Sequence, residues 1–232
     1  MDKRLIPLNG ALALLAKGAG WPNDLTQQGF RLHLLEGDVQ SEPQSVRADV
    51  IAYRTDPDLI LLLECKGGRN VNAAQARGYT NARQAGLRRR GTMPAPLRDH
   101  DHVTVQAVFV GHDQWGDALD ESMAREGIEA PLLLVGPTGA RLTGAAAVSG
   151  LDDFDSRDPR HGHPPSLILV DHESPVEEIR ELLFQQIMVA MAQGAEAVDL
   201  RQAASAIHSF WHQVSRPAQD QFLGQMKAAA QS

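Results

Sequence analysis

The chain has 232 residues, enough for one large domain or for one domain with a modest appendage. Hydrophobic residues make up 43% and aromatic residues only 5%, so we expect a core built mainly from Leu, Val, Ile and Ala. A net charge of -7 argues against a protein that coats nucleic acid through bulk charge. No apolar run approaches the ~20 residues that a membrane span needs. The single cysteine, Cys65, excludes an internal disulfide, and we predict a cytoplasmic protein without a membrane partner.

The first two thirds of the chain carry the pattern of a mixed sheet flanked by helices. Asn9 is a candidate cap of the first helix. The run LILLLECK is apolar on both faces, as a central strand is, and Pro57 in the turn 55–58 separates it from the preceding strand. The expected order is helix 9–19, strands 29–35, 46–54 and 59–66, helix 72–90, strand 103–110, helix 117–127 and strand 131–135. Three successive strands followed by alternation indicate an α/β fold with a mixed central sheet.

The composition changes after residue 148. Residues 149–166 are rich in Asp, Gly, Pro and His, and we expect a linker or loop there. Helical patterns dominate 167–232, where Ser174 is a candidate N-cap. The sequence therefore predicts a core in 1–148 and a small, mainly α-helical C-terminal domain. A winged-helix DNA-binding module and a helical dimerisation module are both open for that domain, so a homodimer or a partner protein is also open.

Two carboxylates and a lysine are expected to meet on one strand pair. If the connection has four residues, Arg54 lies opposite Leu59, and the same register places Asp49 opposite Glu64. Side chains alternate along a strand, so Lys66 shares the face of Glu64. Opposed carboxylates repel each other unless a cation lies between them, and oxygen ligands suit Mg²⁺. A metal held there can polarise a phosphodiester and activate a water.

These residues also carry a family resemblance. Asp49, followed by Glu64-Cys65-Lys66 at the end of an apolar strand, resembles the PD-(D/E)XK nuclease superfamily, which has the restriction-endonuclease-like fold. The segment from Gln75 to Tyr79 resembles the Q-x-x-x-Y motif of RecB-like members. Positions i and i+4 share one side of a helix, so both side chains can face the same site. The resemblance covers roughly residues 9–136.

The chain departs from the family pattern at two points. Ala48 rather than a proline precedes Asp49, and the Pro57-Asp58 dipeptide falls in the predicted turn. Many members carry an acidic residue on the first helix, whereas this first helix has none. Glu36 and Asp38, near the end of the first strand, are the alternatives for that role.

The resemblance implies a Mg²⁺- or Mn²⁺-dependent deoxyribonuclease, in defence, repair or mobile-element processing. The implied catalytic residues are Asp49, Glu64, Lys66, Gln75 and Tyr79. The implied metal ligands are Asp49, Glu64 and the backbone carbonyl of Cys65. Lys66 would be the catalytic lysine, and the Q-x-x-x-Y residues would support the site or contact the nucleic acid.

An arginine-rich stretch is the candidate contact to DNA. The candidate residues are Arg77, Arg83, Arg88, Arg89 and Arg90, with Arg98 nearby. Arg83 is expected to continue the helix side of Gln75 and Tyr79. The alternative interpretation is a solvated helix end, because the helix dipole favours cations at its C-terminus.

Other features have simpler interpretations. Cys65 is expected to point to the buried face as a small core residue. The pairs His100/His102 and His161/His163 lie in loops, where they are weak evidence for zinc. Residues 136–139 lack the lysine of a phosphate loop and are expected to form a turn. Two further functions are open: a catalytically silent nuclease-fold subunit that binds nucleic acid or assembles with a partner, and an unrelated α/β enzyme with a surface ion-pair cluster.

Overall fold

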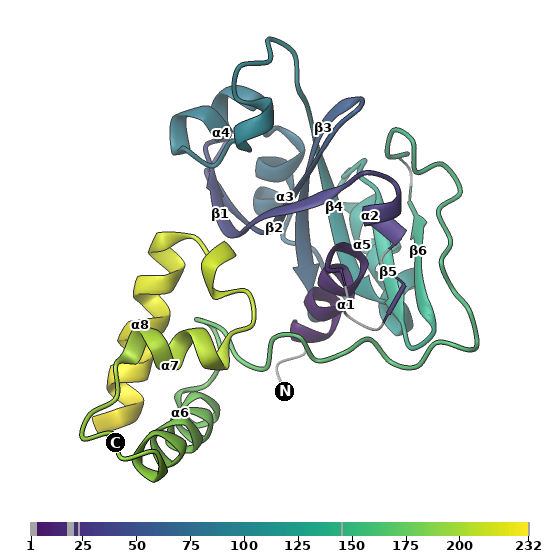
Figure 1. Cartoon of the computed structure of the whole chain (residues 1–232). Helices are drawn as coiled ribbons and strands as arrows, with labels where there is room; N and C mark the ends of the chain where they lie inside the picture. The colour runs from purple at the N-terminus through teal and green to yellow at the C-terminus, as the bar shows by residue number, and fades with distance from the viewer. Residues whose placement is uncertain (1–3, 18–20, 23, 145, 232) are drawn as a thin grey trace. The chain divides into compact units, whose positions relative to one another are not determined.

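The computed structural model describes residues 4–17, 21–22, 24–144 and 146–231. The chain forms two compact units (Figure 1). The N-terminal unit ends at Ser166 and contains the sheet, and the C-terminal unit begins at Leu167 and is helical. Among the helices in these ranges, none is both long enough and apolar enough to cross a membrane.

A six-stranded mixed sheet forms the centre of the N-terminal unit, with its strands in chain order. The strands are β1 Arg31–Val39, β2 Val46–Thr55, β3 Asp58–Lys66, β4 Thr104–His112, β5 Leu132–Gly136 and β6 Gly139–Thr143. Neighbours are antiparallel from β1 to β3, parallel from β3 to β5, and antiparallel between β5 and β6. The predicted α/β class with a mixed sheet and flanking helices is confirmed.

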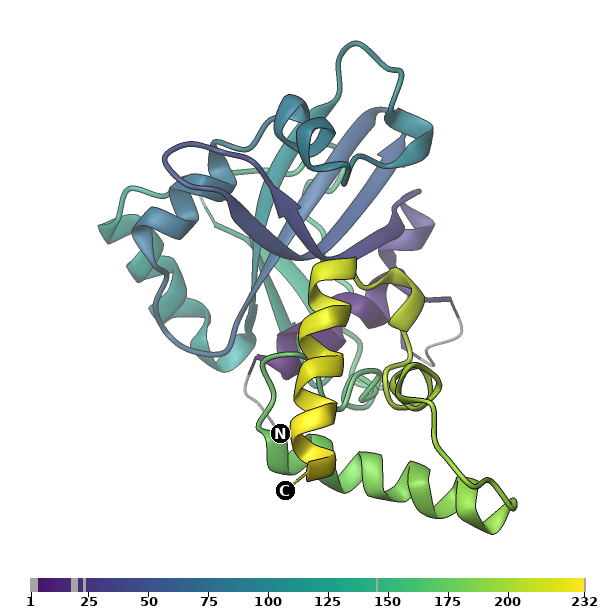
Figure 2. The same cartoon turned by 90° about the vertical axis from the view of Figure 1, so that its left-hand side faces the viewer.

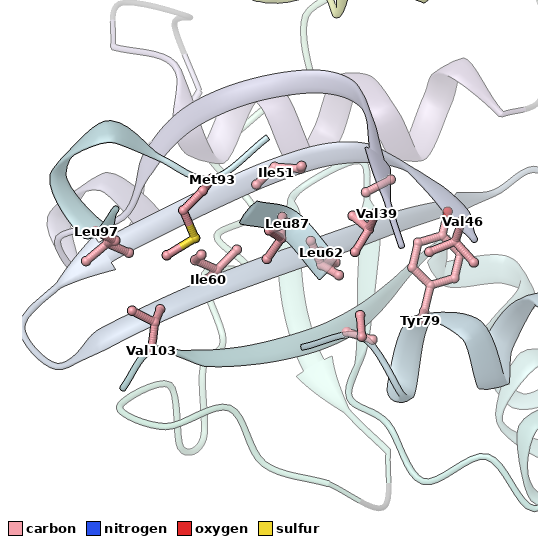
Figure 3. Packing of buried hydrophobic residues seen from close by; sticks show 13 residues of the cluster. Val39, Val46, Ile51, Ile60, Leu62, Tyr79, Leu87, Met93, Leu97 and Val103 are labelled. Carbon is pink, nitrogen blue, oxygen red and sulfur yellow. The ribbon is translucent and has the colours of Figure 1, made fainter. Parts of the chain in front are cut away.

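One face of the sheet is covered by helices that follow β3 and β4. The helices of this unit are α1 Leu5–Leu15, α2 Asp24–Gln27, α3 Ala73–Thr80, α4 Gln84–Arg90 and α5 Gly116–Arg125. Ile60 and Leu62 of β3 pack in one apolar cluster with Tyr79 of α3 and Leu87 of α4 (Figure 3). This cluster anchors α3 and α4 against the sheet, so the side chains of α3 reach the residues of β3.

The helix α1 covers the opposite face. Leu134 of β5 packs with Leu119 of α5, and because side chains alternate along a strand, Val135 points to the other side. There α1 comes so close that a Cβ on Gly10 would lie 2.2 Å from Val135 Cγ1. Glycine at this position allows the backbone of α1 to pack against β5.

The beginning of α1 differs from the sequence prediction. The helix begins at Leu5 rather than at residue 9, so Asn9 lies buried in its interior and is not its cap. Pro7 falls in the first turn, where a helix tolerates proline because the first amides have no intrahelical acceptor. Residues 18 and 19 of the predicted helix lie outside the described residues.

The predicted helix 72–90 is two helices. α3 ends at Thr80 and α4 begins at Gln84, and Arg83 between them is extended, with φ -137° and ψ 158°. Asn81 ends α3 and donates its side-chain amide to Glu42 O at 3.1 Å. The local composition favours a helix that continues through these residues. The helix instead ends where Asn81 contacts a residue outside it.

Strand boundaries also differ from the predicted ones, most of all at the end of the sheet. The strand predicted at 29–35 extends to Val39, and the one predicted at 103–110 extends to His112. The predicted turn at 136–139 is confirmed, and it joins β5 to β6, a strand that the sequence did not predict. The segment 149–166 contains no helix and only an isolated bridge, and Phe154 O accepts from Leu142 N of β6 at 2.9 Å.

The C-terminal unit is helical, as predicted. Its helices are α6 Val176–Ala192, α7 Leu200–Ile207 and α8 Arg216–Gln231, all visible in Figure 2. Their core includes Trp211, Phe222 and Met226. A winged-helix module needs strands, and residues 167–231 contain none.

The start of α6 is not capped as predicted. Ser174 Oγ accepts from Asp171 N at 2.9 Å and donates to Asp171 Oδ1 at 3.1 Å, so it closes a turn before the helix. α6 begins at Val176 and receives no side-chain cap from Pro175. The Ser174 hydroxyl therefore forms its hydrogen bonds with Asp171 and not with the first amides of the helix.

Candidate functional site

The strands β2 and β3 diverge at one end. Their ladder runs from the Thr55–Asp58 pair to the Val50–Leu63 pair. Beyond it, residues 46–48 are paired with β1, and residues 64–66 are paired with β4. We call this end, residues 46–49 and 64–66, the strand fork. The predicted register is confirmed where the strands pair, because Arg54 lies opposite Leu59. The pairing ends at Val50 and Leu63, one position before the predicted pair of Asp49 and Glu64, which is not formed.

Asp49 lies in the strand fork and bridges the two strands. Its Oδ2 accepts a hydrogen bond of 2.5 Å from the backbone amide of Cys65. The hydrogen bond is buried, and only 6% of Asp49 is exposed. Without the carboxylate, the buried Cys65 amide would have no acceptor from β2. The carboxylate thus takes the place of a ladder hydrogen bond at the point where β2 leaves β3.

The second oxygen of Asp49 forms an ion pair with Arg4, which directly precedes α1. Arg4 Nη1 is 2.6 Å from Asp49 Oδ1 and 3.3 Å from Glu36 Oε1. The other acidic alternative, Asp38, pairs with Arg47 at 3.0 Å instead. Of the two acidic residues considered for a third carboxylate, Glu36 therefore lies beside Asp49.

Glu64 is the centre of a second polar group in the strand fork. Its Oε1 accepts from Lys66 Nζ at 2.7 Å and from Gln75 Nε2 at 3.0 Å. Lys66 Nζ also donates to Gln75 Oε1 at 3.1 Å. The ammonium lies 5.9 Å from the centre of the Phe109 ring. A charged carboxylate, a charged amine and an amide thus satisfy one another.

Tyr79 connects this group with the other strand of the fork. Its hydroxyl is in hydrogen-bond contact with Glu64 Oε2 and with the carbonyl oxygen of Arg47. A hydroxyl has one proton, so it donates to one of the two acceptors at a time. Burial and the charge of Glu64 raise the pKa of Tyr79 well above its ordinary value. Tyr79 is therefore a hydrogen-bond donor at neutral pH.

Local features of α3 set the positions of Gln75 and Tyr79. Asn72 caps the helix, since its Oδ1 accepts from Gln75 N at 3.0 Å. A Cβ on Gly78 would lie 2.6 Å from Val46 Cγ1, so glycine permits α3 to approach β2. Gln75 and Tyr79 both reach Glu64, as the i, i+4 spacing predicts.

The Cys65 side chain takes no part in this network. The thiol is buried, and its neighbours Glu64 and Lys66 point to the opposite face. Burial and then the charge of Asp49 raise the pKa of the thiol well above its ordinary value. A neutral buried thiol is a poor nucleophile, which agrees with the predicted core role.

The five candidate DNA-binding arginines are all exposed. Four of them donate to neutral oxygens: Arg77 to Glu126 O, Arg83 to Thr80 O and Ala82 O, Arg88 to Arg98 O and His100 O, and Arg90 to Ser45 Oγ. Such bonds orient the guanidinium groups without neutralising their charge. Arg83 follows the end of α3, so it does not continue the helix side of Gln75 and Tyr79 as predicted.

Two residues that contact or position the side chains of the site were not singled out by sequence reasoning. Arg4 lies 45 positions before Asp49, and no local pattern links the two. Asn72 could have been found, because an Asn immediately before a helical pattern is a cap signal. Of the loop histidines, His100 Nδ1 lies 2.5 Å from Asp58 Oδ2, at the turn end of the β2–β3 hairpin. That pair is at the opposite end of the hairpin from the strand fork.

No protein-family model, curated protein or solved structure matches the chain. The geometry and chemistry of the strand fork are therefore the features of this chain that bear on its function.

Proposed function

We propose that this protein is a metal-dependent nuclease that hydrolyses phosphodiester bonds of DNA, with the strand fork as its active site. The observation that carries the proposal is the placement of two buried carboxylates, Asp49 and Glu64, where two strands diverge, with the half-buried Lys66 paired to Glu64. Burying ionic groups is costly, and apolar residues of similar size often give equal stability. Concentration of such groups at one break in the sheet therefore favours a chemical role over a structural one.

The donor set agrees with a hard divalent cation such as Mg²⁺ or Mn²⁺. Asp49, Glu64 and the backbone carbonyl of Cys65 would supply oxygen ligands, which these ions prefer. The chemistry that a bound cation supplies is polarisation of the phosphate and activation of a water. The resemblance of this residue set to the PD-(D/E)XK superfamily supports the same assignment.

The side chains that contact Glu64 have roles that follow from their contacts. Lys66 can stabilise negative charge that develops on a phosphate. Its ammonium is held by Glu64, on the same face of β3, and by Gln75 of α3. Tyr79 fixes the orientation of the Glu64 carboxylate and ties it to β2. Gln75 orients both Glu64 and Lys66, so we assign it a positioning role.

The exposed arginines of α3 and α4 would contribute the affinity for DNA. Arg77, Arg88 and Arg90 keep their positive charge while neutral oxygens orient them. Arg77 lies on α3, the helix that also carries Gln75 and Tyr79, so one helix connects these arginines with the strand fork. Phosphate contacts of this kind are independent of base sequence and weaken as salt increases.

The test is a cleavage assay with the full chain and Mg²⁺ or Mn²⁺, on linear, circular, single-stranded and branched DNA. Lys66→Met removes the ammonium and keeps the length of the side chain. We expect cleavage to fall by at least about 100-fold, the usual loss when a group that stabilises charge in the transition state is removed. The matched control is Lys227→Met on the exposed surface of α8, which should leave cleavage unchanged. Metal-dependent cleavage that survives in both Lys66→Met and Glu64→Gln would contradict the proposal.

A catalytically silent subunit is the second candidate, and one contact favours it. Arg4 already supplies a cation to Asp49, at 2.6 Å. In that case the purified chain would bind DNA without cleaving it under any of the metal conditions. Filter binding beside the cleavage assay distinguishes the two candidates, and gel filtration tests whether the chain forms a homodimer.

A further inference from the structure

A positive side chain of the protein lies against the carboxylates of the strand fork. Arg4 Nη1 contacts Asp49 Oδ1 at 2.6 Å and Glu36 Oε1 at 3.3 Å, and only 13% of the Arg4 side chain is exposed. The remaining Asp49 oxygen, Oδ2, accepts from the Cys65 amide at 2.5 Å. Both oxygens of Asp49 are thus engaged by donors of the chain.

The backbone of Arg4 is held by its place in the fold. It directly precedes Leu5, which is fully buried, and Leu8 N donates to Arg4 O at 3.3 Å in the first turn of α1. The side chain is long, and rotation about its own bonds can withdraw the guanidinium while α1 stays in place. The contact to Asp49 can therefore open and close without unfolding the helix.

We propose that Arg4 is an internal competitor of the divalent cation at Asp49. This inference rests on the proposed function, because it takes Asp49 to be a metal ligand. A divalent cation on Asp49 Oδ1 would lie beside the Arg4 guanidinium, and two cations at one oxygen repel each other. Arginine keeps its charge at all physiological pH values, so the competition does not depend on pH.

Arg4 and the metal would then alternate as the positive charge beside Asp49. Each neutralises Asp49, which lies beside Glu36, and each removes the repulsion between the two carboxylates. The guanidinium lowers the apparent affinity for the cation, so the site fills only when the metal concentration is high enough to displace it. Binding of a metal is thereby coupled to withdrawal of the Arg4 guanidinium from Asp49.

The experiment measures Mn²⁺ binding to the full chain by isothermal titration calorimetry. Arg4→Met removes the charge and keeps an apolar stem of similar length. Arg4→Gln removes the charge and keeps an N–H donor. We expect both variants to bind Mn²⁺ at least about tenfold more tightly than the wild type. The matched control is Arg157→Met, which removes the ion-pair partner of the exposed Asp155 in the segment 149–166 and should leave the affinity unchanged within about twofold.

Thermal unfolding is the second measurement. Without added metal, Arg4→Met should unfold at a lower temperature than the wild type, because Asp49 and Glu36 lose their counter-ion. Saturating Mn²⁺ should raise its midpoint by more than it raises that of the wild type, since tighter ligands stabilise more. If Arg4→Met does not fold, the affinity of Arg4→Gln decides.

The outcomes separate this inference from the proposed function. Mn²⁺ affinity that is equal or weaker in both Arg4 variants, with clear binding by the wild type, overturns the inference and leaves the nuclease proposal standing. Absence of Mn²⁺ binding in the wild type and in both variants overturns both. Binding only after Arg4 is replaced supports the inference and explains a silent wild type.

Discussion

Two sets of buried polar side chains, one in each unit, are satisfied in different ways. In the N-terminal unit, the buried carboxylates Asp49 and Glu64 contact cationic partners at 2.6 and 2.7 Å. In the C-terminal unit, the buried ring of His208 packs against Trp211 and Phe222, with ring centres 6.5 and 6.3 Å away. Its burial lowers the pKa of His208 to about 4, so the ring is neutral near pH 7.

The difference between charged and neutral buried groups distinguishes a candidate functional site from a packed core. A neutral ring that packs against aromatic side chains serves a core directly, and its ring nitrogen Nδ1 accepts from Phe210 N at 3.2 Å. Charged groups must be compensated by further charges, which gives no advantage over apolar packing. The ionic network of the N-terminal unit therefore agrees with the proposed chemical role, whereas packing accounts for the buried ring of His208.

The largest effect should come from breaking the core of the C-terminal unit. Phe222→Ala removes a fully buried ring from the cluster that joins α6, α7 and α8, which typically costs about 3–5 kcal/mol. Hydrogen–deuterium exchange should accelerate in peptides of α8 and stay unchanged in those of β3. Phe184→Ala is the control, because 60% of Phe184 is exposed on α6, and it should change stability by less than ~0.5 kcal/mol. Equal effects of the two substitutions would contradict the assigned core.

The next effect is a pH dependence confined to the C-terminal unit. The folded pKa of His208 is about 4, below the ordinary value of 6.5, so the unfolded chain binds the proton more readily. Stability from this group is therefore complete above pH 6.5 and falls as the pH decreases toward 4, by about 3 kcal/mol in all. Urea unfolding followed by exchange of α7 and α8 measures it.

A variant sharpens this prediction. His208→Phe removes the titrating group from the cluster of Trp211 and Phe222, so the slope of stability against pH between 6.5 and 4 should flatten. His212→Gln replaces an exposed histidine of the same unit and should leave that slope as it is. A slope that persists in His208→Phe would assign the pH dependence to other groups.

The smallest effect concerns the hydrogen bonds of the strand fork. Tyr79→Phe leaves Glu64 and the carbonyl of Arg47 without the hydroxyl, which should cost about 1–2 kcal/mol in thermal or urea unfolding. Cleavage should fall with it, because Glu64 loses the contact that fixes its orientation. Tyr53→Phe is the matched control on β2, and it should leave both stability and cleavage unchanged. A stability loss without any change in cleavage would place Tyr79 in the core alone.

The register of the central hairpin was predictable, and the break between α3 and α4 was not. Residues 59–66 form one apolar run after a proline turn, and a slip by one residue would move every side chain to the wrong face. The break depends on contacts remote in sequence: Asn81 donates to Glu42 O, and a Cβ on Gly86 would meet Gln40 O at 2.0 Å. The composition of residues 72–90 gives no information on these partners, which lie about 40 positions earlier in the chain.

The same distinction holds within the site. The shared face of Glu64 and Lys66 follows from a period of two residues, and the shared helix side of Gln75 and Tyr79 from a spacing of four, which a sequence displays directly. Arg4 reaches Glu36 and Asp49 across 32 and 45 positions, and only the packing of α1 brings them together. Sequence reasoning thus missed Arg4, which only the fold joins to the site.

Cys65 gives the protein a built-in reporter. It is the single thiol of the chain, and it lies between two residues of the strand fork while facing the buried side of β3. A thiol reagent can reach it only when this strand opens, so the rate of labelling counts opening events of the sheet. No cysteine has to be introduced or removed for that purpose, and the same chain can be followed while its site is titrated.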